Sequence, residues 1–242
     1  AKAAATYEKV AATSDTIPIL QKLVEAYQKA GKTNKALTAY IKLIRKSGTD
    51  KEPFYGFISY LNAKKNPTQA ASFLSTNLKS FPKSYRPEIH TYLGTLYGEQ
   101  GEWRKAINSY KRALAGGVTN PLIHLNLGEA YSRIGNYRQA EKSLLTYLKS
   151  KPKDVDARLR LAAVYRKRNK NNDAIKILKG VIKDNPKSLK AHLALVDLYE
   201  KLNRDKEAAA VYEAIAKLSP DNKVVYYNQG VLYYEMKQYD RA

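Results

Sequence analysis

One alanine recurs through the chain at an almost constant interval. Neighbouring members of the series are 34 residues apart, with one interval of 36, and the series is Ala36, Ala70, Ala106, Ala140, Ala174, Ala208 and Ala242. A tyrosine, or in one case Leu61, stands nine residues before each alanine. A period of this length predicts a solenoid in which each repeat buries apolar surface only against its neighbours. Such an array offers a long binding surface and brings no chemistry of its own.

Prolines and turn residues divide each period into two helices. Pro152, Pro186 and Pro220 are also 34 residues apart, and each one precedes a new amphipathic segment. Proline ends one helix and is tolerated in the first turn of the next. Gly101 and Gly135 lie between the periodic tyrosine and the periodic alanine, in short segments typical of a tight turn. We therefore expect each unit to contain a helix A, a turn, a helix B and a second turn.

The residues at these positions resemble those of the tetratricopeptide repeat. That repeat has a large residue, Leu-Gly and Tyr in helix A, then Ala, an aromatic residue and Ala in helix B, and a closing Pro. The unit 121–154 follows this pattern with His124, Leu127, Gly128, Tyr131, Ala140, Leu144, Tyr147 and Pro152. The resemblance implies an all-α, right-handed superhelical solenoid of antiparallel helix pairs. It has about six full repeats plus a half repeat at each end.

The expected units follow from the spacing. They are 1–16 (helix B of a truncated repeat), 17–50, 51–86, 87–120, 121–154, 155–188, 189–222 and 223–242 (helix A of a truncated repeat). The unit 51–86 is degenerate, because Leu61 replaces tyrosine and two extra residues fall at Tyr85 and Arg86.

The half repeats at the two ends indicate a fragment of a longer protein. The alternative is head-to-tail self-association through the open ends. In the last half repeat we expect apolar surface to be exposed at Val224, Val225, Leu232 and Tyr233.

The charge balance indicates acidic partners. Lys and Arg number 43 against 22 Asp and Glu, a net charge of +21. The unit 155–188 is strongly basic, with ten bases and three acids. The chain has no cysteine, which excludes disulfides and thiolate chemistry, and no apolar run of the ~20 residues that span a membrane. The sequence is typical of a soluble protein and leaves its compartment open between cytoplasm and periplasm.

No residue pattern indicates catalysis. His90, His124 and His192 occupy the same place in helix A of three units, where a large residue packs. Equivalent places in adjacent repeats are ~8–10 Å or more apart, whereas zinc ligands lie ~2 Å from the metal. We therefore interpret these histidines as packing residues, and we expect no enzymatic activity, no cofactor and no metal site.

The resemblance places the binding surface on one face of the A helices, which lines the inner groove. Carried over by repeat position, the candidate partner-binding residues are Tyr55, Tyr92, Asn126, Arg133, Arg160, Arg166, Lys167, Lys201, Tyr227 and Tyr234. On this face, pairs four residues apart are expected to neutralise each other, namely Glu25–Lys29, Glu129–Arg133 and Asp197–Lys201. Arg160, Arg166 and Lys167 are expected to lack enough nearby acids to cancel their charge, which makes them the favoured anion-binding patch.

These observations predict a non-enzymatic scaffold whose groove holds an acidic segment of a partner protein. Tyrosines would supply rigid contact area, and the bases would select the acidic segment. Two alternatives stay open. One is binding of an anionic polymer, either an acidic polysaccharide or a nucleic acid, and the other is the self-assembly described above.

Overall fold

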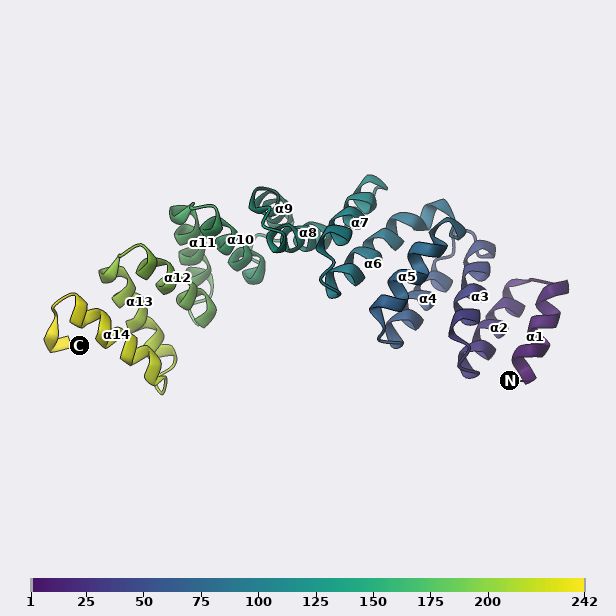
Figure 1. Cartoon of the computed structure of the whole chain (residues 1–242), viewed down its shortest axis with the longest axis horizontal. Coiled ribbons are helices and arrows are strands. Elements are labelled where there is room, and N and C mark those ends of the chain that lie inside the picture. Colours follow the sequence, from purple (N-terminus) through teal and green to yellow (C-terminus); the bar gives the residue numbers. More distant parts are fainter. Residues whose placement is uncertain (1, 242) are drawn as a thin grey trace. The chain divides into compact units, whose positions relative to one another are not determined.

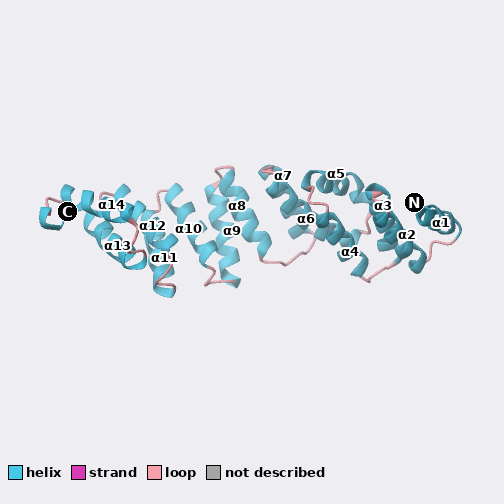
Figure 2. Cartoon of the chain, turned by 90° about the horizontal axis from the view of Figure 1, so that it is seen from below, coloured by secondary structure: helices cyan, strands magenta, loops and turns pink. Residues whose placement is uncertain are grey.

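The computed structural model describes residues 2–241, so Ala1 and the last periodic alanine, Ala242, lie outside the described residues. Within them the chain forms fourteen α-helices and three short 3-10 helices and contains no strand (Figures 1 and 2). The all-helical class expected from the sequence is confirmed. The chain divides into two compact units, residues 1–119 and 120–242, which are described separately.

The helices have the following bounds. The N-terminal unit contains α1 (Lys2–Thr13), α2 (Ile17–Lys29), α3 (Thr33–Lys46), α4 (Glu52–Ala63), α5 (Pro67–Asn77), α6 (Arg86–Glu99) and α7 (Trp103–Ala115), with 3-10 turns η1 (Leu78–Ser80) and η2 (Lys83–Tyr85). The C-terminal unit contains α8 (Leu122–Arg133), α9 (Tyr137–Ser150), α10 (Val155–Lys167), α11 (Asn171–Asp184), α12 (Leu189–Lys201), α13 (Asp205–Leu218), α14 (Lys223–Glu235) and η3 (Tyr239–Arg241).

Small residues set the distance within the helix pairs. The periodic alanines inside the described region are all buried. Gly94 of α6 and Gly128 of α8 lie against the second helix of their pairs, and a Cβ atom on Gly94 would stand 2.5 Å from the ring of Tyr110. A larger residue at either glycine would therefore force the two helices apart. The turns within the pairs use left-handed backbone, with a φ of 74° at Gly101 and 57° at Asn169.

The degenerate repeat is packed differently from the others. Ile58 of α4 stands at the repeat position of Gly94 and Gly128, and the backbones of α4 and α5 make few close approaches. Aromatic side chains fill the space instead. The ring of Phe57 has its centroid 5.4 Å from that of Phe81 and 6.3 Å from that of Phe73. The repeat that departs most from the sequence pattern therefore keeps a filled core through larger side chains.

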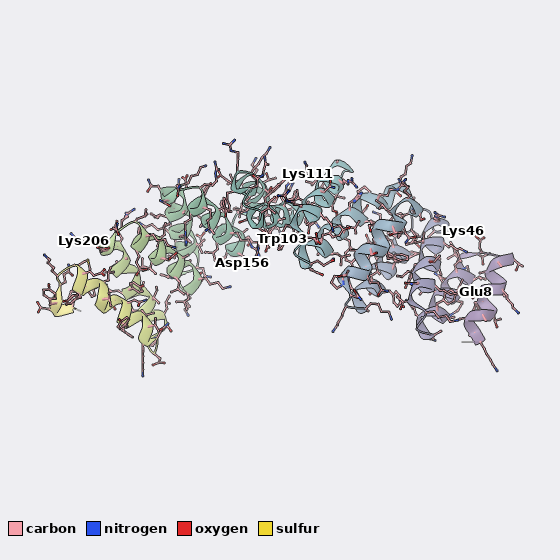
Figure 3. The ribbon with its side chains drawn as sticks, in the orientation of Figure 1. Glu8, Lys46, Trp103, Lys111, Asp156 and Lys206 are labelled. Carbon is pink, nitrogen blue, oxygen red and sulfur yellow. The ribbon has the colours of Figure 1, made fainter. Side chains whose placement is uncertain are left out.

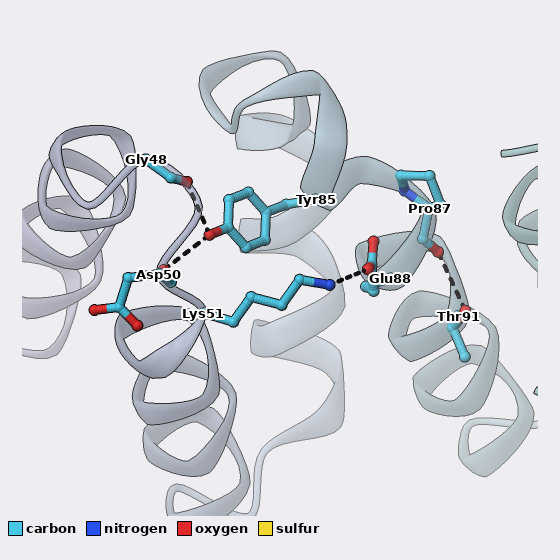
Figure 4. A network of polar contacts seen from close by, with 7 residues as sticks. All are labelled: Gly48, Asp50, Lys51, Tyr85, Pro87, Glu88 and Thr91. Atoms are coloured by element: carbon cyan, nitrogen blue, oxygen red, sulfur yellow. Dashed lines mark hydrogen bonds and ion pairs between the residues drawn. The ribbon is translucent and has the colours of Figure 1, made fainter. Parts of the chain in front are cut away.

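The two extra residues of this repeat hold its connectors in place. The buried Tyr85 hydroxyl donates hydrogen bonds to the carbonyl oxygens of Gly48, at 3.3 Å, and Asp50, at 3.0 Å (Figure 4). The Arg86 guanidinium donates to carbonyl oxygens at the end of the preceding helix, including that of Lys79 at 3.2 Å. Both side chains thus satisfy backbone groups that no helix pairs.

The apolar residues of α14 do not lie as expected. Val224 is exposed, but Val225, Leu232 and Tyr233 are buried. Tyr233 also donates a hydrogen bond to Glu213 of α13 at 2.6 Å. The expectation of exposure is therefore wrong for three of the four residues, because they pack against the preceding repeat.

Candidate partner-binding surface

In the N-terminal unit the candidate residues are polar and aromatic. Tyr55 of α4 is exposed, and the Tyr92 hydroxyl of α6 donates to Oδ1 of Asn62 at 2.5 Å, which ties α6 to α4. Burial raises the pKa of Tyr92. Glu25 of α2 pairs with Lys22 at 3.1 Å, so the expected pairing with Lys29 is wrong.

A cavity opens beside these helices. It has a volume of about 410 Å³ and is lined by residues of α2, α3, α4 and the connector between α3 and α4, which include Gln21, Val24, Glu25, Gln28, Tyr40, Leu43, Asp50, Glu52, Pro53 and Gly56. The Tyr40 hydroxyl at its wall accepts a hydrogen bond from Gln28 at 2.9 Å.

In the C-terminal unit we name the solvent-accessible side of α8, α10, α12 and α14 the A-helix face. It carries the remaining candidates, which are Asn126, Arg133, Arg160, Arg166, Lys167, Lys201, Tyr227 and Tyr234. In Figure 3, Asp156 at the start of α10 and Lys206 at the start of α13 point to different edges of this unit.

Two acids on this face are each shared by two bases. Glu129 of α8 pairs with Arg133 at 3.3 Å and with Arg160 of α10. Asp197 of α12 likewise forms ion pairs with two bases, Arg166 and Lys201. The pair Glu129–Arg133 confirms the sequence-based expectation, whereas the bond to Arg160 was not anticipated.

A second cluster lies two repeats further on, and here the additional base comes from the preceding repeat. Asp197 pairs with Lys201 at 3.0 Å and with Arg166 of α10 at 2.6 Å. The expectation that Arg160 and Arg166 lack nearby acids is therefore wrong. The acids come from the neighbouring repeats, 31 residues away along the chain, and a count within one repeat does not include them. Only the third residue of that expected patch, Lys167, is exposed and has no partner within residues 2–241.

A hydrogen-bonded chain continues from α12 to α14. The Tyr212 hydroxyl of α13 donates to Glu200 of α12 at 2.7 Å and accepts from Nδ2 of Asn228 of α14 at 3.3 Å. Burial, together with the bond to Glu200, raises the pKa of Tyr212 to about 12. Consecutive first helices of the pairs are thus tied together by polar contacts, and between α12 and α14 these run through the buried Tyr212.

The A-helix face becomes apolar on α14. Val224, Tyr227, Val231 and Tyr234 are spaced so that they lie on one side of the helix, and their exposed fractions are 65, 72, 41 and 65%. The ring of Tyr239 packs edge-on against that of Tyr234, with centroids 5.4 Å apart. The sequence predicted Tyr227 and Tyr234 as binding residues from their positions in the repeat, but it was not used to predict the apolar strip. The helical spacing of these tyrosines with Val224 and Val231 would have indicated it.

Several basic side chains of the unit 155–188 form ion pairs between helices. Arg168 and Lys170 both bind Glu141 of α9, the latter at 2.8 Å, and Arg158 binds Asp184 at 2.6 Å. Burial favours the neutral form of Glu141, but the bonds from Lys170 and Arg168 lower the pKa of this carboxyl.

The histidines lie in the packing layer. His192 is buried, with Nδ1 3.0 Å from the carbonyl oxygen of Ser188, and His90 and His124 are half-buried. Burial lowers the pKa of both half-buried rings. Residues 2–241 contain no cluster of side chains suited to a metal ion. No helix in the described part is long and apolar enough to cross a membrane.

Family models for the tetratricopeptide repeat match residues 94–135, 125–170 and 159–223, which together make up more than half of the chain. The chain belongs to the tetratricopeptide repeat family. Tetratricopeptide repeat proteins bind protein or peptide partners, and the fold is typical of interaction scaffolds. No curated protein matches the sequence.

Solved structures of tetratricopeptide repeat proteins share the fold. The protein YrrB, described as having an unusual peptide-binding site, is 18% identical, with a TM-score of 0.66, over 80% of this chain and 99% of its own. MamA is 23% identical, with a TM-score of 0.55, over 62% and 87%. A tetratricopeptide repeat protein of Parabacteroides merdae is 18% identical, with a TM-score of 0.55, over 92% and 74%. At these identities the likeness establishes the fold alone.

Proposed function

We propose that this tetratricopeptide repeat protein is a non-enzymatic scaffold and that its C-terminal unit binds an acidic segment of a partner protein on the A-helix face. The observation that carries this proposal is the arrangement of the ion pairs. Glu129 and Asp197 each pair with two bases, and the group formed by Asp197, Arg166 and Lys201 holds two bases for one acid. Lys167 adds a cation that no acid neutralises within residues 2–241.

An incoming carboxylate would find donors still available on this face. A guanidinium has five N–H donors, and an ion pair with a single carboxylate uses only some of them. The clusters also hold Arg160 and Arg166 in fixed positions, which lowers the conformational entropy lost when a partner binds. Charge complementarity of this kind mainly raises the association rate and the selectivity for acidic segments. The peptide-binding site reported for YrrB supports a peptide as the ligand class.

A peptide titration with matched charge reversals tests the proposal. Fluorescence anisotropy would follow a labelled peptide of Asp, Glu and Ser as protein is added. The double variant Lys167→Glu and Lys201→Glu is expected to weaken binding at least ~10-fold, since two favourable contacts become repulsive. The control is Lys176→Glu with Lys183→Glu, which changes the net charge equally on exposed residues of α11.

Equal weakening by both double variants would contradict the assignment of the A-helix face. A net charge of +21 also favours anionic polymers as ligands. Heparin or single-stranded DNA would then bind with an affinity that falls steeply with salt concentration. Both pairs of lysine-to-glutamate substitutions would weaken that binding equally. That result would replace the peptide scaffold with the polymer-binding alternative.

A further inference from the structure

We infer that the ligand of the C-terminal unit is an acidic segment that also carries large apolar or aromatic side chains. Its apolar side chains would lie on the strip of α14 and on Leu193 of α12. Its carboxylates would lie over Lys167 and Lys201. This inference rests on the proposed function and specifies the partner chemistry of the same face.

Helix α14 is apolar on two sides. Val225 and Leu232 are buried on one side, whereas Val224, Tyr227 and Val231 are exposed on the other. A surface helix normally has one apolar side, which packs against the core, so a second apolar side in solvent is unusual. Scattered exposed apolar residues are ordinary, but a row of them along one helix marks an interaction surface.

In α8 and α12, which are followed by further repeats, the corresponding side of the helix remains exposed. Leu122 of α8 and Leu193 of α12 occupy the repeat positions of Val224 and Tyr227. Both helices are followed by further packed helices, yet Leu122 is 50% exposed and Leu193 is 43% exposed. The strip is therefore on the binding side of the repeats and is available to another molecule.

The charges on this face indicate that the ligand is acidic. A second copy of the chain would also carry +21, so the two copies repel each other. A basic segment would meet the uncompensated Lys167 and the excess charge at Arg166 and Lys201. A purely apolar segment would leave these cations without new partners. An acidic segment with apolar side chains satisfies both parts of the surface.

The tyrosines suit this ligand. Tyr227 and Tyr234 combine a large apolar ring, which would pack against apolar side chains of the ligand, with a hydroxyl that stays in contact with solvent. The packing of Tyr239 against Tyr234 restricts that ring before the ligand arrives. Less rotamer freedom is then lost on binding.

Four labelled peptides of equal length test the inference. One alternates Asp or Glu with Leu or Phe, one replaces the apolar residues with Ser, one replaces the acids with Ser, and one replaces the acids with Lys. The first is expected to bind tightest, and each replacement is expected to weaken binding at least ~10-fold, because each removes contacts to one part of the surface.

Protein variants locate the contact. Tyr227→Ser is expected to weaken binding of the acidic and apolar peptide ~5- to 30-fold, and it should leave the weaker binding of the Ser-substituted acidic peptide unchanged. Tyr226→Ser, a neighbouring tyrosine of α14 on another side of the helix, is the control and is expected to have little effect. Far-UV circular dichroism would confirm that both variants are folded.

The outcomes separate this inference from the proposed function. If the acidic peptides bind equally with and without apolar residues, and Tyr227→Ser leaves the affinity unchanged, the inference is overturned. The proposed function, a scaffold that binds an acidic segment, is then retained. If reversing Lys167 and Lys201 has no effect on any peptide, the proposed function itself fails. Tightest binding of the Lys-substituted or the purely apolar peptide, or self-association that Tyr227→Ser abolishes, would overturn the inference as well.

Discussion

Two glycines of α6, one turn apart, should respond differently to substitution by alanine. Gly94 faces Tyr110 of α7, and a Cβ atom there would stand 2.5, 2.6 and 2.8 Å from three atoms of the ring. At Gly98 the nearest atom to an added Cβ is Cζ3 of Trp103, at an ordinary contact distance of 3.8 Å. Comparing alanine variants at the two positions therefore distinguishes the effect of helix propensity on stability from the effect of packing against the neighbouring helix.

The magnitudes follow from these distances. Alanine in place of glycine stabilises a helix by up to about 1 kcal/mol, and Gly98→Ala, in the last turn of α6, should show a gain of this order. Gly94→Ala gains the same amount but must displace a buried ring, which costs about 1–3 kcal/mol. The ring has little freedom to move, because the Tyr110 hydroxyl lies 3.2 Å from Oγ1 of Thr95 in a hydrogen bond. The two variants should thus differ by about 1–3 kcal/mol in the free energy of unfolding, with Gly94→Ala the less stable.

Urea unfolding followed by far-UV circular dichroism measures this difference. The midpoint should rise for Gly98→Ala relative to the parent protein and should be lower for Gly94→Ala than for Gly98→Ala, with similar slopes. Gly94→Val, which adds more atoms against the same ring, should lower it further. Equal midpoint shifts of the same sign for the two alanine variants would refute the close approach of α6 and α7 as the reason for glycine at this position.

Two further substitutions test the polar contacts. Glu141→Gln should destabilise the C-terminal unit by about 1–3 kcal/mol at neutral pH, since it weakens charged hydrogen bonds to partly buried bases. Because those bases lower the pKa of the folded carboxyl, the contribution is full above the unfolded pKa and is lost as the pH falls through the folded pKa. Thermal melts of both proteins should therefore converge in acid, and a constant gap would contradict the ion pairs. Tyr85→Phe removes the hydroxyl bonds to the connector between α3 and α4 and should cost about 0.5–1.5 kcal/mol, measured by urea unfolding, whereas an unchanged midpoint would show that those bonds add nothing.

The sequence predicted those features that every repeat must share. Ala140 recurs because two helix backbones approach closely there, and that requirement appears in each period as an alanine. The position of Gly128 varies more, since the degenerate repeat has Ile58 there. The sequence pattern also located the degenerate repeat from Leu61. It could not show that Phe57, Phe73 and Phe81 fill the wider gap between α4 and α5, since their contacts depend on three-dimensional packing.

The ion pairs of the candidate site show where sequence reasoning stops. Pairs four residues apart on one helix, such as Asp197–Lys201, are fixed by helix geometry and could be predicted. The contacts of Asp197 with Arg166 and of Glu129 with Arg160 join different repeats. Their existence depends on the rotation between neighbouring helix pairs, which a residue count within one repeat does not specify.

The repeat design separates stability from recognition. The position of the periodic alanine, where two helix backbones meet, holds the same small residue in repeat after repeat, whereas the position of Val224 is Leu122 in α8, Asp156 in α10 and Lys190 in α12. Because such a side chain is largely in solvent, its identity can change without disturbing the buried alanines and glycines. The chemistry of the A-helix face therefore varies from charged on α10 to apolar on α14 over an unchanged core. For the same reason Tyr227→Ser and the reversal of Lys167 should alter binding with little effect on unfolding, so a binding defect in these variants would report on the surface and not on the fold.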